Sequence, residues 1–346
     1  MYVKKILIVG PSWVGDMMMA QVLFQLLHQQ NPACELHVLA PAWSQALLSR
    51  MPEVQKSIVL PFGHGQLKLR ARYQFAKQLK SENYDQAIVM PNSLKSALIP
   101  YWANIPKRTG WLGEYRFGLL NDIRYLNKKQ LPKMVQRFAA LAFSRETILP
   151  ANLPIPQFSI RPADVDFALQ KQGLMRTSQP IIALCPGAEF GSSKCWPPSH
   201  FAAIANQKLN EGWVVWIFGS ANDRVIAETI QTQTEQRCVN LAGKTALSEA
   251  VDLLSLANCV VTNDSGLMHI AAALDRSVVA LYGSTSPDYT PPLSHHAKII
   301  KKNLSCQPCF KRECLLKHHD CMKLLLPGEV LKVMEGFHQY KPTSKT

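Results

Sequence analysis

The residues best suited to chemistry lie in short polar turns that follow apolar, strand-like segments. In the stretch VVTNDSGLMHIAAA, two valines end a strand, and a helix-forming run begins at Leu267 after the capping residues Asp264 and Ser265. The first N–H groups of such a helix are unpaired and carry the positive end of its dipole, so they suit a phosphate or diphosphate. An ordinary capped turn between a strand and a helix has the same pattern.

A second turn of this kind, PGAEFGSSKCWP, follows another apolar segment. Its small residues allow the backbone to approach a ligand, and Ser192, Ser193 and Lys194 can hydrogen-bond to phosphates and neutralise them. A single lysine in a loop is usually only solvated, but two candidate phosphate turns in one half of the chain favour a binding site. In a third turn, FGSAND, Asp223 fits either ribose hydroxyls or a helix N-cap.

The turn after the first strand, GPSWVGD, ends in Asp16. It imitates a phosphate-binding P-loop but has Asp16 where the lysine should be, and a carboxylate there would repel phosphates. It also fails the dinucleotide pattern, because Ser12 and Trp13 occupy positions that must be small. Two interpretations remain: Asp16 accepts a proton from a substrate hydroxyl, or it is an acidic residue favoured by the dipole at the start of a helix.

Four of the nine cysteines are bunched as C-x2-C-x4-C-x6-C, namely Cys306, Cys309, Cys314 and Cys321, with two histidines among them. Such a set can bind zinc or an iron–sulfur cluster, but the spacing matches no standard zinc ribbon or ferredoxin run. Reduced thiols or adventitious disulfides in a surface loop are favoured, so no metal is expected. The sequence DVD at residues 164–166 fits a helix cap better than a divalent metal site.

Strands that alternate with helices position these turns in both halves of the chain. This alternation predicts an α/β fold with two Rossmann-like, doubly wound parallel sheets, whose strand ends face a central cleft. Four prolines between Leu149 and Pro162 mark a boundary. We therefore expect one domain over residues 1–155, a second over 156–326, and a C-terminal helix and tail over 327–346 that packs back on the first domain. The family resemblance described below implies that the first domain binds the acceptor and the second binds the donor.

The chain has 38 lysine and arginine residues and 24 aspartate and glutamate residues, which gives a formal net charge of +14. This charge suits nucleic acid, an anionic membrane or a phosphorylated substrate, and no nucleic-acid-binding motif accompanies it. No apolar run is long enough to span a bilayer, and the N-terminus lacks the apolar length of an export signal. We expect a cytoplasmic protein that does not bind nucleic acid.

Several long motifs in order, from KKILIVGPSWVGDMMMAQ and RTGWLGEYRFGLLND through CPGAEFGSSKCWP to SPDYTPPLSH, resemble the ADP-heptose:lipopolysaccharide heptosyltransferases over nearly the whole chain. The resemblance implies a GT-B glycosyltransferase fold. It also implies metal-independent, inverting transfer of L-glycero-D-manno-heptose from ADP-heptose onto the first heptose of the lipopolysaccharide inner core, with no cofactor required. The cysteine cluster occurs in only some of these relatives, so its role stays open.

The resemblance also assigns roles to residues. Asp16 is expected to be the catalytic base, and Lys194 is expected to stabilise charge on the leaving diphosphate. Asp264 is expected to bind sugar hydroxyls or to cap its helix, and the role of His269 stays open between the site and the core. The expected donor-binding residues are Ser192, Ser193, Asp223, Asp264, Ser265, Gly266, Leu267, Met268 and His269.

The implied acceptor, heptosyl-Kdo2-lipid A, is anionic and lies at the inner membrane, which the net positive charge would suit. We therefore expect an enzyme peripheral to the anionic inner-membrane surface. The candidate acceptor or membrane contacts are Lys68, Arg70, Arg72, Lys95, Arg108 and Arg116. Two alternatives remain at this point: a nucleotide-sugar epimerase of the same fold, and a non-catalytic protein that binds polyanions.

Overall fold

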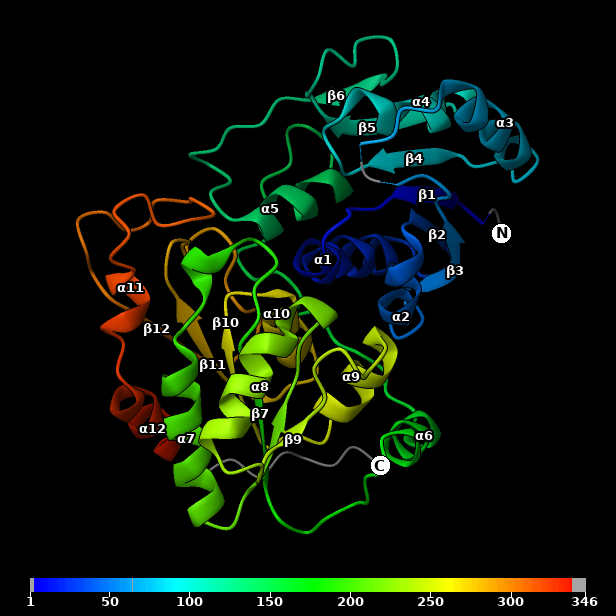
Figure 1. The fold of residues 1–346 in the computed structure, drawn as a ribbon. Coiled ribbons are helices and arrows are strands. Elements are labelled where there is room, and N and C mark those ends of the chain that lie inside the picture. Colours follow the sequence, from blue (N-terminus) through cyan, green and yellow to red (C-terminus); the bar gives the residue numbers. More distant parts are fainter. Residues whose placement is uncertain (1–2, 64, 338–346) are drawn as a thin grey trace. The chain divides into compact units, whose positions relative to one another are not determined.

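The computed structural model describes residues 3–63 and 65–337. The chain divides into two compact units, Met1–Ser159 and Ile160–Thr346, so the division falls close to the boundary expected after residue 155. Each unit is built on one parallel six-stranded sheet (Figure 1). This is the doubly wound α/β architecture that the alternating pattern predicts, and that part of the prediction is confirmed.

The first unit has the strand order β3-β2-β1-β4-β5-β6. The central strand β1 reads KILIV and is apolar on both faces, as a strand covered by helices on both sides requires. The strands are β1 (Lys5–Val9), β2 (Glu35–Ala40), β3 (Val54–Val59), β4 (Gln86–Val89), β5 (Lys107–Trp111) and β6 (Asp122–Arg124). The helices are α1 (Val14–Gln30), η1 (Ala42–Ser44), α2 (Gln45–Leu48), α3 (Leu69–Lys80), α4 (Leu94–Trp102), α5 (Met134–Ala139) and η2 (Ala140–Ala142).

Strands β5 and β6 were not predicted, because residues 104–130 lack an apolar period. Polar side chains tie these strands together instead. Gln86 of β4 donates to the Thr109 hydroxyl at 3.0 Å, and that hydroxyl donates to the Asp122 carboxylate of β6 at 3.0 Å. The Asp122 carboxylate also pairs with Arg124 at 2.9 Å. Side chains that hydrogen-bond to one another across strands therefore replace the apolar alternation that sequence patterns detect.

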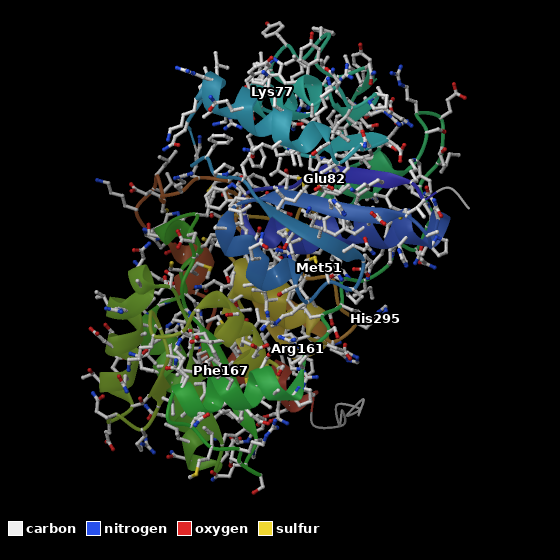
Figure 2. The ribbon with its side chains drawn as sticks, turned by 90° about the vertical axis from the view of Figure 1, so that its right-hand side faces the viewer. Met51, Lys77, Glu82, Arg161, Phe167 and His295 are labelled. Atoms are coloured by element: carbon white, nitrogen blue, oxygen red, sulfur yellow. The ribbon has the colours of Figure 1, made fainter. Side chains whose placement is uncertain are left out.

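Helix α3 separates an inner from an outer face. Arg72, Ala76 and Leu79 are buried against the unit, whereas Lys77 lies on the exposed face of the helix (Figure 2). Because apolar residues recur three to four positions apart, one stripe of the helix packs on the core and the other keeps its charges in water.

The second unit has the order β12-β11-β10-β7-β8-β9. Read from the β9 edge, this order repeats that of the first sheet, with β7 in the place of β1 and β10 in the place of β4. Its strands are β7 (Ile181–Cys185), β8 (Val214–Ile217), β9 (Val239–Asn240), β10 (Cys259–Asn263), β11 (Ser277–Tyr282) and β12 (Ala297–Lys301). Its helices are α6 (Pro162–Lys171), η3 (Ser192–Lys194), α7 (Pro198–Asn210), η4 (Ala221–Asp223), α8 (Arg224–Gln233), α9 (Leu247–Leu254), α10 (Gly266–Ala273), α11 (Asp320–Lys323) and α12 (Pro327–Glu335).

The point where the strand order reverses lies between β1 and β4 in the first sheet and between β7 and β10 in the second. Open α/β sheets bind their ligands beyond the carboxyl ends of the strands at such points. The turn that carries Asp16 follows β1, and the two turns that carry Lys194 and Asp264 follow β7 and β10. The topology therefore brings the candidate residues of each unit to the ligand-binding end of its sheet.

The last helix, α12, packs against α7 and β11 of the second unit (Figure 1). The expected packing of the C-terminal segment on the first domain stays a prediction. Val330 and Met334, one helical turn apart, belong to the buried core of that unit, and the Trp196 indole N–H donates to the Leu325 carbonyl at 2.8 Å just before the helix. Residues 338–346, where we expected the tail, lie outside the described residues.

Within residues 3–63 and 65–337, no helix combines the length and the apolar character needed to cross a membrane.

Candidate active site

The two candidate phosphate turns of the second unit are joined through Asn263, the last residue of β10. Its side-chain amide donates to the Pro186 carbonyl at 2.6 Å, and its side-chain oxygen accepts the Trp196 N–H at 3.1 Å. These two bonds hold both ends of the 186–197 loop beside the start of α10. Asn263 is fully buried, so its bonds are not exchanged with water. The loops are therefore fixed relative to each other.

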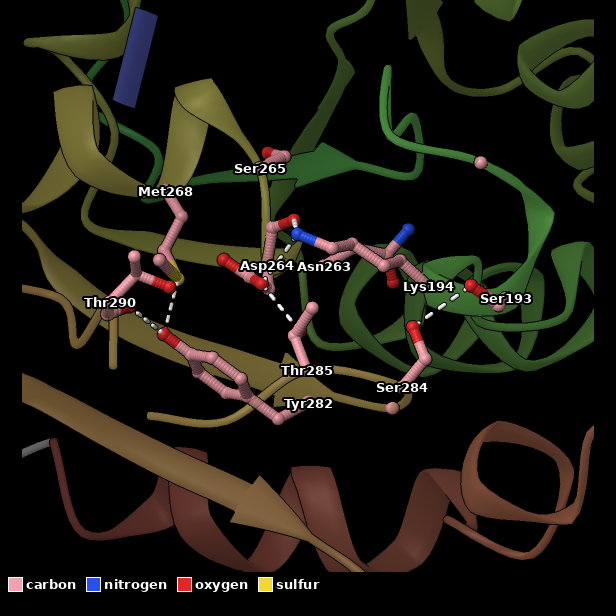
Figure 3. A network of polar contacts seen from close by, with 12 residues as sticks. Ser193, Lys194, Asn263, Asp264, Ser265, Met268, Tyr282, Ser284, Thr285 and Thr290 are labelled. Atoms are coloured by element: carbon pink, nitrogen blue, oxygen red, sulfur yellow. Dashed lines mark hydrogen bonds and ion pairs between the residues drawn. The ribbon is translucent and has the colours of Figure 1, made fainter. Parts of the chain in front are cut away.

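Lys194 reaches the start of α10 and pairs with Asp264 (Figure 3). Its ammonium lies 2.6 Å from the Asp264 carboxylate and donates to the Asp264 carbonyl at 3.2 Å. Thr285 donates its hydroxyl to the same carboxylate oxygen at 2.5 Å. The two charged side chains are largely buried, with 13% of Lys194 and 4% of Asp264 exposed. Asp264 is therefore the partner of the candidate phosphate-binding lysine.

The beginning of α10 is open to a ligand although most of the helix is buried. Ser265 is its N-cap and makes no side-chain cap hydrogen bond. Ser265, Gly266 and Leu267 are partly exposed, whereas Met268 and His269 are buried. The backbone N–H groups of the first turn are thus the groups that can meet an anion. This arrangement agrees with the anion-binding interpretation of the sequence.

Met268 and His269 belong to the core beneath that turn. The Tyr282 hydroxyl donates to the Thr290 carbonyl at 2.6 Å, and its oxygen lies 3.5 Å from the Met268 sulfur (Figure 3). Burial, with a smaller effect of Lys194 and against the attraction of Asp264, lowers the pKa of His269 to about 4. The imidazole is therefore neutral at neutral pH, and its burial supports the core interpretation over a charged donor contact.

Ser192 and Ser193 have different surroundings. Ser193 is buried; its N–H donates to the Arg312 carbonyl at 3.1 Å, and its hydroxyl lies 2.9 Å from that of Ser284. Its hydrogen-bonding groups therefore hold the loop in place. Ser192 is exposed and stays a candidate donor contact.

Asp223 has the geometry of a helix cap. Its carboxylate accepts the Ser220 N–H at 2.7 Å and the Ser220 hydroxyl at 2.8 Å at the start of η4. The same carboxylate faces the lysine-bearing loop, because a Cβ atom added to Gly187 would lie 2.3 Å from it. Asp223 therefore caps η4 and also lies beside the 186–197 loop that carries Lys194, which is called the donor loop below. Contact of Asp223 with ribose hydroxyls stays a proposal.

Asp16 lies in the first turn of α1, in the other unit. The helix follows β1 after a short turn, so Asp16 is at the carboxyl end of the central strand and is half-buried. Trp13, the N-cap residue, makes no side-chain cap hydrogen bond and is 51% exposed. The positive end of the helix dipole favours an ionised carboxylate at this position. A half-buried carboxylate at the ligand-binding end of a sheet is suited to general-base catalysis.

Two of the six candidate acceptor contacts are buried and donate hydrogen bonds to backbone carbonyls. Arg72 is 3% exposed; its guanidinium donates to the Leu67 carbonyl at 2.7 Å and the Gln66 carbonyl at 3.0 Å. Arg116 is fully buried and donates to the Pro91 carbonyl at 2.6 Å. Burial lowers the pKa of both guanidiniums. We correct these two assignments, because each side chain satisfies backbone carbonyls inside the first unit.

The other four candidates remain accessible to different degrees. Arg108 is partly buried and donates to the Leu119 and Ile105 carbonyls, both at 2.6 Å. Lys68 and Arg70 are exposed at the start of α3, and Lys95 is partly exposed in the first turn of α4. Lys68, Arg70 and Lys95 are therefore the acceptor candidates whose charges stay available.

The four clustered cysteines are free thiols. Burial, together with repulsion from Cys306, Cys309 and Cys314, raises the pKa of the Cys321 thiol to about 11. Within the described part of the chain, no group of three or more His, Cys, Asp or Glu side chains is arranged to hold a metal ion.

Sequence reasoning quoted SPDYTPPLSH as a family-like motif but assigned no role to the loop after β11, GSTSPDYT, whose Ser284 and Thr285 contact Ser193 and Asp264. This loop also follows an apolar strand and is rich in small polar residues, so the criterion used for the other turns would have found it. It also missed Asn263, whose role depends on β7 and β10 being neighbours.

Two parallel sheets of the same strand order, each with its candidate residues at the switch point, have the two-domain architecture of the GT-B type. Comparison with known proteins agrees. The model of glycosyltransferase family 9 (heptosyltransferase) matches residues 72–319. A lipooligosaccharide heptosyltransferase 2 of Haemophilus influenzae is 52% identical over 341 residues, which cover 96% of this chain and 91% of that protein.

A lipopolysaccharide heptosyltransferase 2 of Escherichia coli is 45% identical over 341 residues, covering 96% of this chain and 98% of that protein. The solved structure of E. coli ADP-heptose lps heptosyltransferase II has a TM-score of 0.87 at 42% identity and covers 96% of this chain and 98% of that one. The chain therefore belongs to glycosyltransferase family 9, the heptosyltransferases. It is an enzyme that uses a nucleotide-sugar donor. The GT-B fold is confirmed, and the epimerase and polyanion-binder alternatives are not favoured.

Proposed function

We propose that this enzyme transfers L-glycero-D-manno-heptose from ADP-heptose onto the first heptose of the lipopolysaccharide inner core, with inversion at the anomeric carbon and without a metal. The observation that carries the site assignment is the buried pair of Lys194 and Asp264 at the open start of α10. The relatives named heptosyltransferase 2 support the choice of donor and acceptor.

The second unit is proposed to hold the donor. Lys194 and the N–H groups of Ser265, Gly266 and Leu267 would contact the diphosphate. These groups are held in place before the reaction, so their attraction for the negative charge that grows on the leaving ADP costs no reorganisation. Each such donor is worth about 3 kcal/mol in the transition state. Ser192 and Asp223 would contact other parts of the nucleotide sugar.

Asp16 of the first unit is proposed to act as the base. It would remove the proton from the acceptor hydroxyl while that oxygen attacks the anomeric carbon from the face opposite ADP. The new C–O bond forms as the bond to the diphosphate oxygen breaks, so ADP leaves with the electron pair and the configuration inverts. A base poised in this way contributes about 10²–10⁴-fold to the rate.

The acceptor is proposed to be heptosyl-Kdo2-lipid A at the anionic inner-membrane surface, with the enzyme cytoplasmic and peripheral to that surface. Lys68, Arg70 and Lys95 are the candidate contacts, because their side chains are accessible. Arg72 and Arg116, in contrast, are buried and donate to backbone carbonyls. The formal net charge of +14 favours an anionic acceptor in an anionic surface.

Incubation of the enzyme with ADP-heptose, with and without heptosylated lipid A core, tests the proposed reaction. ADP release and the heptosylated product should appear together and should both require the acceptor. Release of ADP at the same rate without the acceptor would refute transfer as the enzyme's reaction. Nuclear magnetic resonance of the product should show the inverted anomeric configuration.

A further inference from the structure

Arg312 lies in the cysteine-bearing segment, yet its backbone is attached to the loop that carries Lys194. The Ser193 N–H donates to the Arg312 carbonyl at 3.1 Å. The Phe310 N–H donates to the Ser284 carbonyl at 2.7 Å, and the hydroxyls of Ser284 and Ser193 lie 2.9 Å apart. The segment around Arg312 is thus tied both to the donor loop and to the loop that braces it.

Gly191 makes this close approach possible. Its φ is +150°, and a Cβ atom at this position would lie 2.3 Å from the Arg312 carbonyl oxygen. Any side chain would therefore push Arg312 away from the loop, which only glycine avoids. The position of Arg312 beside the donor loop is consequently enforced by the main chain.

The side chains of Arg312 and Lys194 both contact the aromatic ring of Phe190. The guanidinium carbon of Arg312 lies 5.7 Å from the centroid of the Phe190 ring, and the Lys194 ammonium lies 5.0 Å from the same centroid. Both distances are within the range of cation–π attraction. Phe190 therefore contacts both Arg312 and the lysine that we assign to the diphosphate.

The charge balance of the site calls for this second cation. The charge of Lys194 is already matched by Asp264 at 2.6 Å, so the pair offers little net charge to a diphosphate. Arg312 is exposed and forms no ion pair with any other residue that the structure describes. A guanidinium presents a planar set of donors that matches phosphate oxygens, so it is well suited to supply the missing charge.

We propose that Arg312 is a second diphosphate-binding residue of the donor site, delivered to Lys194 by the segment between Cys306 and Cys314. This assignment rests on the proposed donor site. Arg312 would contact the phosphates of ADP-heptose and share with Lys194 the charge that develops on the departing ADP.

Titration calorimetry of the full chain with ADP and with adenosine tests this role, because adenosine lacks the phosphates. Arg312→Ala should weaken ADP binding about tenfold and change adenosine binding less than about twofold. Arg312→Lys should recover part of the ADP affinity, since it keeps the charge without the planar donors. Transfer kinetics should show a raised KM for ADP-heptose and an unchanged KM for the acceptor.

Lys311→Ala is the matched control. Lys311 is the neighbouring exposed cation, and its side chain makes no ion pair or ring contact with the residues that the structure describes, so its loss should leave ADP binding unchanged. An equal loss of ADP affinity in Lys311→Ala and Arg312→Ala would overturn the proposal in favour of a general field effect. Equal weakening of ADP and adenosine by Arg312→Ala, or unchanged ADP binding, would overturn it as well.

A Lys194→Ala variant measured in parallel separates this proposal from the donor site on which it rests. Weaker ADP binding in both variants supports both assignments. If Lys194→Ala binds ADP normally while Arg312→Ala does not, the role of Lys194 fails and that of Arg312 stands. If only Lys194→Ala is impaired, the role of Arg312 fails.

Discussion

The Lys194 ammonium lies 2.6 Å from the Asp264 carboxylate and 3.2 Å from the Asp264 carbonyl oxygen. One aspartate therefore binds the lysine through both its side chain and its main chain, at the first unpaired N–H groups of α10. The carboxylate and a bound diphosphate would compete for the same ammonium. In the proposed donor site, Asp264 would therefore position the lysine in the free enzyme and would also weaken its attraction for the diphosphate.

This competition gives the two residues opposite predicted effects on ADP binding. Asp264→Asn should leave ADP affinity unchanged or raise it, because the ammonium loses its competing anion, while kcat falls about tenfold as the lysine loses its fixed position. Lys194→Ala should lower ADP affinity and kcat together. Calorimetry with ADP and steady-state kinetics with ADP-heptose measure both. Asp264→Asn with weakened ADP binding and normal kcat would contradict this relationship.

Thr285 should act through Asp264. Its hydroxyl donates to the Asp264 carboxylate at 2.5 Å and is buried, so Thr285→Val leaves that oxygen with one partner fewer. We expect Thr285→Val to lower kcat/KM for the donor, with a loss of transition-state stabilisation of about 1–2 kcal/mol. Thr285→Ser, which keeps the hydroxyl, serves as the control and should retain near-normal kinetics. Equal kinetics for the valine and serine variants would remove Thr285 from the donor site.

His269 should make the protein less stable in acid. Its pKa is about 4 in the folded protein and about 6.5 when unfolded, so the unfolded state binds more protons between these values. The stabilising effect of the neutral imidazole is fully present above pH 6.5 and is lost as the pH falls towards 4. Between pH 7 and pH 5 the loss is about 2 kcal/mol.

Urea denaturation of the wild type and of His269→Gln at both pH values measures this effect. The wild type should lose more of its free energy of unfolding than the variant over this pH range. The variant lacks the titrating group, so other acid-sensitive residues cancel in the comparison. Equal losses in the two proteins would show that His269 does not titrate as its burial indicates.

Chelation should not impair transfer. Lys194 and the N–H groups of α10 are proposed to stabilise the leaving diphosphate in the way a divalent metal does in other transferases. Initial rates after treatment with EDTA should therefore stay within about twofold of the untreated enzyme. A rate that collapses with EDTA and returns with Mg²⁺ would contradict the metal-independent mechanism.

The fold was largely predictable because the central strands are apolar on both faces. Strand β7 is a continuous apolar run, β1 and β10 contain the apolar runs ILIV and CVV, and the turns after these strands carry the candidate residues. Strands β5 and β6 could not be found in this way, because Thr109 and Asp122 hold them through polar bonds. Apolar periodicity detects burial of hydrocarbon but not hydrogen bonds between distant side chains.

Individual site residues were harder to interpret for the same reason. Lys194 and Asp264 were each singled out, but their pairing depends on β7 and β10 lying side by side in the sheet, although the residues are 70 positions apart. From the sequence, Arg72 and Arg116 were interpreted as surface cations. In the structure both side chains are buried and donate to backbone carbonyls. A sequence shows where a charge stands along the chain, and only the tertiary structure shows what that charge contacts.

The most direct test of the account measures two properties of one variant, Asp16→Asn, because a base in one unit and a donor site in the other should separate cleanly. Calorimetry should give an ADP affinity within about twofold of the wild type, while single-turnover transfer from ADP-heptose to the heptosylated acceptor should fall by at least about a hundredfold. Near-normal transfer by Asp16→Asn would contradict the assignment of the base and the mechanism that depends on it.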